Sequence, residues 1–291
     1  MAETNGNGRS PLRIILLVLI VVVLPLIVGL YAAPRLVAQP KVGVIRLSYD
    51  INSGTSYEIT EQLNYAREHG DIKAVVLIIN SPGGSAAYSE ELYLAVLNTR
   101  EKMPVVASID LMAASGAYYM AAAANEIYAK PTSNVGSVGV IAQLPTEVYI
   151  EEDLLTTGPY KAFGGTRDGS VRQIERAKFA FLQAVSVGRD ERLKISLTDL
   201  SRAEIYTGVQ AWEYGLVDDL ISTEEAISRA ADMAHVKNYE VVELYPLTFN
   251  SDVNYLYGAY QPQPLNVEQL WVPPTNSPAG LYYRYIVPAN H

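Results

Sequence analysis

Cysteine is absent from this chain of 291 residues, and histidine occurs only three times. Without cysteine, neither disulfides nor thiolate metal sites can form. The histidines, His69, His235 and His291, are scattered along the chain, so metal catalysis lacks its usual ligands. We therefore expect no metal and no cofactor.

Positive charge is also scarce. The 22 Lys and Arg residues are outnumbered by 31 Asp and Glu, which gives a formal net charge of −9. Nucleic-acid binding needs a cationic surface that displaces counterions, and no basic cluster is present. A DNA or RNA partner is therefore not expected.

One long apolar run stands near the N-terminus, where residues 14–33 contain no charge. In a helix this run spans about 30 Å, the thickness of a hydrocarbon core, so it predicts a transmembrane helix in the lipid bilayer. The alternative is a cleavable signal peptide, but its apolar stretch is usually shorter, and Pro34 makes a poor cleavage junction. Basic residues on the two sides of the run balance, so charge leaves the orientation open.

The rest of the chain alternates between strand-like and helix-like patterns. Strands are expected at 41–49, 72–80, 104–110, 126–130 and 137–142, and helices at 57–69, 88–100, 115–123, 171–193 and 223–234. This alternation predicts an α/β domain with a largely parallel sheet. The predicted organisation is a polar N-terminus (1–13), the anchor (14–33), a linker (34–40), the folded domain (41–245) and a C-terminal extension (246–291).

The C-terminal extension differs in composition from the domain before it. It has seven prolines and six tyrosines but only three charged side chains. So much proline argues against regular structure, and so much apolar surface should dock on something, either its own domain or a neighbouring subunit.

Two short motifs could carry chemistry. "MAASGAYYMA" (112–121) places Ser115 where a strand gives way to a helix, so the amide of Gly116 would face developing negative charge there. The alternative is a small residue that lets a helix start pack closely. "NSPGGS" (80–85) follows a buried strand and could turn backbone amides into a cleft, or could be a plain glycine turn.

A nucleophilic serine needs a base, and the histidines fit that role badly because each stands in a polar or terminal position. Lysine can replace histidine if burial lowers its pKa. By elimination the candidate is Lys161, in "TTGPYKAFGGTRD", which has apolar and glycine neighbours.

With these motifs, together with "GSVGV" (136–140) and "YKAFGGTRD" (160–168), residues 41–234 resemble the signal peptide peptidase A family of membrane-anchored serine peptidases. "YTGVQAWEYGLVDDL" (206–220) is similar to an element shared more widely among related folds. The resemblance implies a Clp protease/crotonase-like domain built from repeated β-β-α units.

The resemblance also implies roles for individual residues. Ser115 would be the nucleophile and Lys161 the general base, with Gly84 and Gly116 supplying the oxyanion-hole amides and Ser137 orienting the lysine amine. It further implies a domain on the extracytoplasmic side of the cell membrane, peptide and protein substrates, and a homo-oligomeric ring or dome in which Ser115 of one protomer meets Lys161 of its neighbour.

The chain departs from the family pattern at two positions. Ser85 stands where a third glycine is common, and Ala117 where a glycine is frequent in the nucleophile motif. Both changes are small in volume, so we expect them to tune the substrate groove without removing activity.

The leading hypothesis is a serine endopeptidase that cleaves residual signal peptides and other apolar peptides or proteins at the membrane. The alternatives are a membrane protease of the type that partners stomatin-like proteins, a crotonase-type acyl-CoA enzyme, and a catalytically inactive scaffold. A crotonase would call for a carboxylate near the amides and no anchor.

Overall fold

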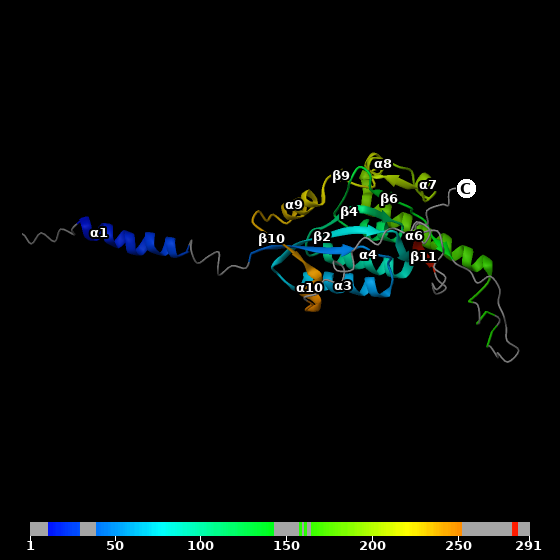
Figure 1. Cartoon of the computed structure of the whole chain (residues 1–291), viewed down its shortest axis with the longest axis horizontal. Helices are drawn as coiled ribbons and strands as arrows, with labels where there is room; N and C mark the ends of the chain where they lie inside the picture. Colours follow the sequence, from blue (N-terminus) through cyan, green and yellow to red (C-terminus); the bar gives the residue numbers. More distant parts are fainter. Residues whose placement is uncertain are drawn as a thin grey trace, which may run out of the picture. The chain divides into compact units, whose positions relative to one another are not determined.

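The computed structural model describes residues 11–29, 39–142, 157–158, 160–161, 164–251 and 281–284. The chain divides into two compact units, Met1–Pro40 and Lys41–His291 (Figure 1). Each unit is described separately below.

The first unit is helical where it is described. The α-helix α1 (Pro11–Val18) leads into a π-helical stretch, η1 (Leu19–Val23), and residues 24–29 return to α-helix. The large apolar side chains assigned an exposure in this unit are exposed. No helix among the described residues is both long and apolar enough to cross a membrane. Residues 30–33 of the predicted anchor lie outside the described part of the chain.

The second unit is built on a mainly parallel sheet (Figure 1). Its main strands, in spatial order, are β10 (Glu240–Glu243), β1 (Lys41–Leu47), β2 (Ile72–Ser81), β4 (Val105–Ala114), β5 (Glu126–Ala129) and β9 (Asp219–Leu220). All of these neighbours pair in parallel. Beyond residue 111, β4 also pairs with β6 (Asn134–Gly136), which carries the antiparallel β8 (Ile205–Thr207).

Helices cover both faces of this sheet. One face carries α3 (Ser53–Glu68), α4 (Ala86–Arg100), α5 (Gly116–Ala121) and part of α6 (Arg167–Arg189), and the other carries α9 (Thr223–Met233). Shorter helices complete the unit: η2 (Asp190–Arg192), α7 (Leu197–Leu200), α8 (Gly208–Glu213) and α10 (Leu244–Phe249).

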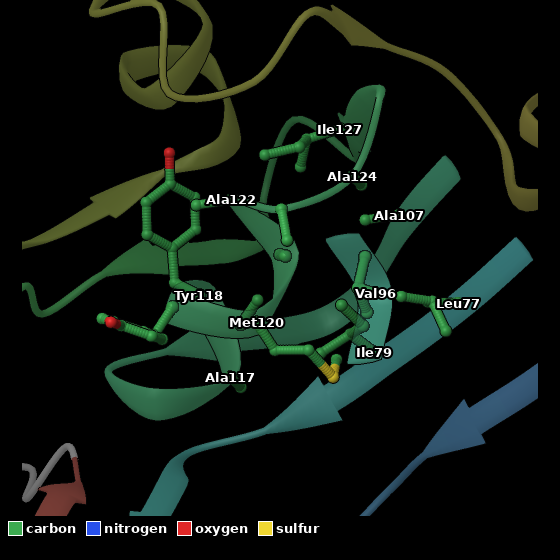
Figure 2. Packing of buried hydrophobic residues seen from close by; sticks show 14 of the residues in the cluster. Leu77, Ile79, Val96, Ala107, Ala117, Tyr118, Met120, Ala122, Ala124 and Ile127 are labelled. Atoms are coloured by element: carbon green, nitrogen blue, oxygen red, sulfur yellow. The ribbon is translucent and has the colours of Figure 1, made fainter. Parts of the chain in front are cut away.

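The central strand β2 explains the two-sided core. Successive side chains of a strand point to opposite faces, and β2 is apolar almost throughout, as expected of a strand buried on both sides. Val75, Leu77 and Ile79 enter the larger core with α3–α6, whereas Val76 and Ile78 pack with α9. Figure 2 shows the larger core, where α5 residues such as Met120 lie against β2 and α4.

A second, smaller sheet is antiparallel and has three strands, in the order β3 (Gly83–Ser85), β11 (Leu281–Arg284) and β7 (Ile141–Ala142). The middle strand comes from the C-terminal extension and pairs with both of the others. This sheet lies at the carboxyl ends of β2 and β4, since β3 follows β2 directly and contacts α5.

These observations confirm the predicted α/β domain with a largely parallel sheet. Two expectations were wrong. Residues 137–142 do not form one strand: only Ile141–Ala142 is a strand, while β6 ends at Gly136, because the backbone reverses at the positive φ of Ser137. The C-terminal extension is not wholly irregular either, since it contains most of α10 and the strand β11.

Candidate active site

The site lies where β2 and β4 end side by side. Ser81 at the end of β2 pairs with Ala113 near the end of β4. The chain then turns into β3 after β2 and into α5 after β4, so both glycine-containing motifs leave the sheet at the same edge. In open α/β sheets this edge is the usual place for a ligand site.

Ser115 occupies the turn between β4 and α5. Its backbone has φ 54° and ψ −123°, a conformation that L-residues rarely adopt. The turn is held by hydrogen bonds on both sides: the Ser115 amide donates to Gly136 O at 2.8 Å, and its carbonyl accepts from the Tyr119 amide at 2.9 Å. Strained backbone of this kind is found at nucleophile turns, where it points the side chain away from the helix.

The side chain of Ser115 does not perform the role that serine usually has at a helix start. It is the N-cap residue of α5, yet it makes no capping hydrogen bond. Its Oγ is buried, with the residue only 1 % exposed, and finds no hydrogen-bond partner among the described residues. A buried hydroxyl without a partner destabilises a fold, so close packing alone would be better served by alanine.

Gly84 lies in β3 with its backbone against Ile51. A Cβ built there would meet Ile51 O at 2.1 Å, so a side chain does not fit. Ile51 donates to Gly83 O and accepts from the Ser85 amide, each at 2.8 Å. Because backbone groups alternate along a strand, the N–H and C=O of Gly84 must then face the opposite side, toward β11.

Ser137 lies close to the nucleophile turn, directly after Gly136, which pairs with Ala114. Ser137 also has a positive φ of 54°, is largely buried, and donates its amide to Glu204 O at 2.8 Å. The structure therefore places Ser115, Gly84, Gly116 and Ser137 at one edge of the sheet.

The structure does not bring Lys161 to this group within one chain. Lys161 is exposed, and it precedes Arg167, the first residue of α6, in the chain. None of residues 167–180 is buried, whereas the C-terminal end of α6 packs in the core through residues such as Phe181 and Val185. Among the described residues of a single chain, Lys161 therefore lacks the burial that a lysine base needs.

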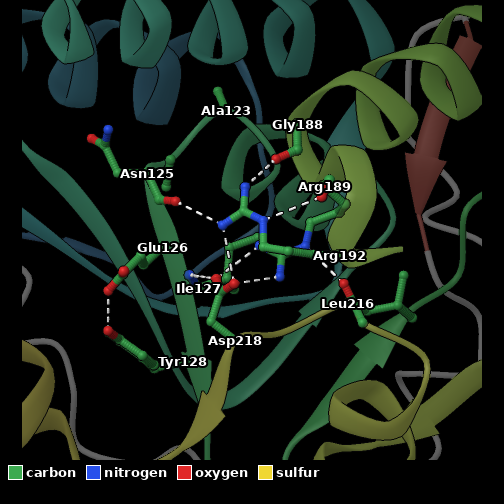
Figure 3. A network of polar contacts seen from close by, with 12 residues as sticks. Ala123, Asn125, Glu126, Ile127, Tyr128, Gly188, Arg189, Arg192, Leu216 and Asp218 are labelled. Atoms are coloured by element: carbon green, nitrogen blue, oxygen red, sulfur yellow. Dashed lines mark hydrogen bonds and ion pairs between the residues drawn. The ribbon is translucent and has the colours of Figure 1, made fainter. Parts of the chain in front are cut away.

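A buried ion pair fixes that C-terminal end, and the sequence analysis missed it (Figure 3). The fully buried Arg189 donates two hydrogen bonds to Asp218, at 2.8 and 2.7 Å, and its Nε donates to Gly215 O at 2.8 Å. Asp218 also accepts from the Ile127 amide at 2.7 Å and from Arg192 at 3.0 Å. The only signal in the sequence was the position of Asp218 within the motif 206–220 that related folds share.

Electrostatics favour the charged form of this pair. Burial alone would raise the pKa of Asp218, but the hydrogen bonds and charge of Arg189, the Ile127 amide and the charge of Arg192 together hold that pKa below its ordinary value. Nearby, Tyr118 of α5 donates to Leu216 O at 2.8 Å, and burial raises the pKa of its phenol. The network thus ties α5, which follows Ser115, to α6 and the loop before β9.

Other candidate groups play no part in the site. His69 and His235 are exposed, as expected, and His291 lies outside the described residues. Across the described ranges, no group of His, Asp and Glu side chains is arranged to hold a metal ion.

Comparison with known proteins supports a peptidase. A sequence profile of peptidase family S49 matches residues 98–237, and a Clp protease profile matches residues 37–136. The chain is 31% identical over 210 residues to a putative protease of Synechocystis, which covers 67% of this chain and 75% of that protein.

Longer relatives match in part. The chain is 28% identical to Protease 4 of Haemophilus influenzae, covering 74% of this chain but 38% of that protein. It is also 28% identical to a putative signal peptide peptidase SppA of Enterococcus faecium, covering 62% of this chain and 57% of that protein. The extent of these matches shows that the chain belongs to peptidase family S49, the signal peptide peptidase A family.

Proposed function

We propose that this chain is a membrane-anchored serine endopeptidase in which Ser115 is the nucleophile and Lys161 the general base. The observation that carries the proposal is the Ser115 hydroxyl, which is buried, has no hydrogen-bond partner among the described residues and is held in a strained turn at the sheet edge. A fold that keeps such a hydroxyl retains a destabilising group, which is expected where the group performs chemistry.

In the proposed reaction, a neutral Lys161 amine removes the Ser115 proton as Oγ attacks the carbonyl carbon of a peptide bond. The amides of Gly84 and Gly116 stabilise the resulting oxyanion. The intermediate collapses to an acyl-enzyme when the protonated lysine gives its proton to the leaving amine. Water, deprotonated by the same lysine, then attacks the ester. The lysine returns this proton to Ser115 Oγ as the ester bond breaks, which releases the second product and free Ser115.

The lysine comes from a neighbouring protomer in this proposal. In its own chain Lys161 is exposed at the far end of α6 from the packed core. Docking of that end over the nucleophile of a second copy would bury the amine, which lowers a lysine pKa, and would bring it to Ser137 for orientation. The active form is then a closed homo-oligomer, a ring or a dome.

The membrane anchor is proposed from residues 14–33, whose length and lack of charge match a hydrocarbon core. The peptidase domain would lie on the extracytoplasmic side. An anchor places the site beside the bilayer, so we propose residual signal peptides and other apolar peptides or proteins near the membrane as substrates.

The test is hydrolysis of casein and of a signal-peptide substrate by the detergent-solubilised full chain, beside Ser115→Ala and Lys161→Ala variants with unchanged folding and assembly. Each variant should lose at least about 1,000-fold in kcat/KM. Retained activity in Lys161→Ala would assign the base to another residue. A wild type that cleaves no peptide but binds acyl-CoA would favour the crotonase hypothesis.

Mixing the two inactive variants tests the shared site. If subunits exchange at random and each site takes its serine and its lysine from different copies, an equal mixture restores about a quarter of the sites. No recovery in a mixture with demonstrated exchange would place both residues in one chain.

A further inference from the structure

Two adjacent glycines form the turn that carries the proposed oxyanion amide of Gly84. Gly83 has a φ of 94°, and glycine backbone rotates more freely than that of any other residue. The N–H of Gly84 belongs to the peptide group between the two glycines, so the orientation of that rigid group decides where the N–H points. A precise oxyanion donor therefore requires that the peptide groups on both sides of Gly83 be held in place.

The peptide group after Gly83 is held by the segment that follows β1. Its carbonyl oxygen, Gly83 O, accepts a hydrogen bond from the Ile51 amide at 2.8 Å. The C=O and N–H of a trans peptide group point in opposite directions. The N–H of Gly84 is thereby directed away from Ile51.

The peptide group before Gly83 is held by the side chain of Ser81. Ser81 is fully buried at the end of β2, where it pairs with Ala113, two residues before Ser115. Its Oγ accepts from the Gly83 amide at 3.2 Å and donates to Tyr49 O at 2.6 Å. A hydroxyl has a single proton, so donation to Tyr49 leaves an oxygen lone pair for the Gly83 amide.

Both hydrogen bonds depend on residues 49–51, and the start of α3 fixes this segment. Asn52 and Thr55 form a reciprocal capping box at the first turn of α3, and Thr55 Oγ1 donates to Asp50 O at 3.0 Å. The two peptide groups that flank Gly83 are therefore held against one rigid support.

We propose that Ser81 is a positioning residue of the oxyanion hole, whose hydroxyl holds the Gly83 backbone so that the Gly84 N–H stays directed at the developing negative charge. This inference rests on the proposed peptidase function and assigns a further residue to the same site. Ser81 does not contact the substrate, because it acts only through the backbone of the two glycines.

The first test is steady-state hydrolysis of a signal-peptide substrate by full-length Ser81→Ala. Oxyanion stabilisation acts in the transition state, so kcat should fall at least about tenfold while KM stays unchanged. The matched control is Ser108→Ala. Ser108 is a buried serine of β4 whose Oγ donates to Thr223 Oγ1 of α9 at 3.2 Å, and its loss should leave kcat and KM within about twofold of wild type.

Two inhibitors distinguish positioning from a general structural effect. A peptide aldehyde forms a bond from its carbonyl carbon to Ser115 Oγ, its oxygen takes the electron pair in the oxyanion hole, and the serine proton passes to Lys161. The matching peptide amide binds without forming a bond. Ser81→Ala should weaken the aldehyde at least about tenfold and leave the amide unchanged. Equal weakening of both inhibitors would overturn the positioning role.

A pair of variants of similar shape isolates the hydroxyl itself. Ser81→Thr keeps the hydroxyl and Ser81→Val replaces it with a methyl group, while both add the same second branch at a buried position. The threonine variant should have a kcat at least about tenfold higher than the valine variant. Equal kcat values would show that the hydroxyl does not act on the reaction.

The outcomes separate this proposal from the one on which it rests. If wild type cleaves no peptide, the peptidase proposal fails. If wild type cleaves in a Ser115-dependent manner but folded Ser81→Ala keeps its kcat or changes only in KM, the positioning role is wrong and the peptidase stands. If neither Ser81→Ala nor Ser81→Val folds, the hydroxyl is a requirement of folding and the positioning role is rejected.

Discussion

The two ends of α6 differ sharply in how the fold holds them. The C-terminal end is buried, with Arg189 paired to Asp218. The N-terminal end is exposed, and the proposed base Lys161 precedes it. The comparison teaches that, among the described residues, one chain assembles the surroundings of Ser115 but leaves the proposed base Lys161 exposed. The predictions below test that difference, from the largest expected effect to the smallest.

Asp218→Asn should have the largest effect on stability. It leaves the buried Arg189 without a counter-charge, which costs about 3–5 kcal/mol in the free energy of unfolding. The matched change at the other end is Asp168→Asn, in the exposed first turn of α6, which should cost at most about 1 kcal/mol. Urea unfolding monitored by circular dichroism measures both, and equal losses would contradict the comparison.

Glycine-to-alanine changes test whether the C-terminal end of α6 is packed more tightly than its N-terminal end. A Cβ at Gly188 would lie 2.0 Å from Ala122 O, so Gly188→Ala should force α6 away from α5 and cost about 1–3 kcal/mol. At Gly169 the nearest atom is the side-chain oxygen of Thr166 at 3.2 Å, so Gly169→Ala should change stability by less than about 1 kcal/mol. Thermal unfolding of the two variants gives the answer, and a destabilised Gly169→Ala would show that the exposed end is also tightly packed.

Acid should remove the stabilising contribution of the buried ion pair. The native pKa of Asp218 is lowered, so its ionised form stabilises the fold. This contribution is fully present above the unfolded-state pKa of aspartate, about 3.9, and is lost as pH falls from there through the lower native pKa. The stability gap between wild type and Asp218→Asn should therefore narrow below about pH 4. A gap independent of pH from 7 to 3 would contradict this.

The smallest effects concern the two proposed catalytic side chains. Ser115→Ala removes a buried hydroxyl that has no partner among the described residues, so the variant should be more stable than wild type by up to about 1 kcal/mol, although inactive. Lys161→Ala, at an exposed position, should leave the free energy of unfolding within about 0.5 kcal/mol. Chemical denaturation distinguishes the two, and a destabilised Ser115→Ala would indicate a structural role for the hydroxyl.

Much of the fold could be predicted because it depends on patterns among residues that are close together in the sequence. The apolar runs of β1 and β2 and the helical patterns between strands identified the parallel α/β domain. The glycine-rich turn at 80–85 and the small residues around Ser115 located the sheet edge for the same reason, since each marks a place where backbone must approach closely.

What could not be predicted depends on distant residues. The positive φ of Ser137 ends the extended conformation in a segment whose sequence alternates like a strand. Because this residue is not a glycine, the sequence gives no signal of the positive φ. The strand β11 lies in a segment rich in proline and tyrosine, and its pairing with β3 joins residues about 200 positions apart. Arg189 and Asp218 are 29 residues apart and look like ordinary surface charges until the chain folds.

The anchored helix α6 acts as a lever. Its 23 residues extend about 35 Å, so a tilt of about 5° at the Gly188 contact displaces the far end by about 3 Å. Catalytic groups tolerate errors of well under about 1 Å. The packing of Gly188 against the Ala122 carbonyl would thus control where the proposed base Lys161 lies in the site of a neighbouring subunit. A packing defect at Gly188 would then be detected as a loss of catalytic rate.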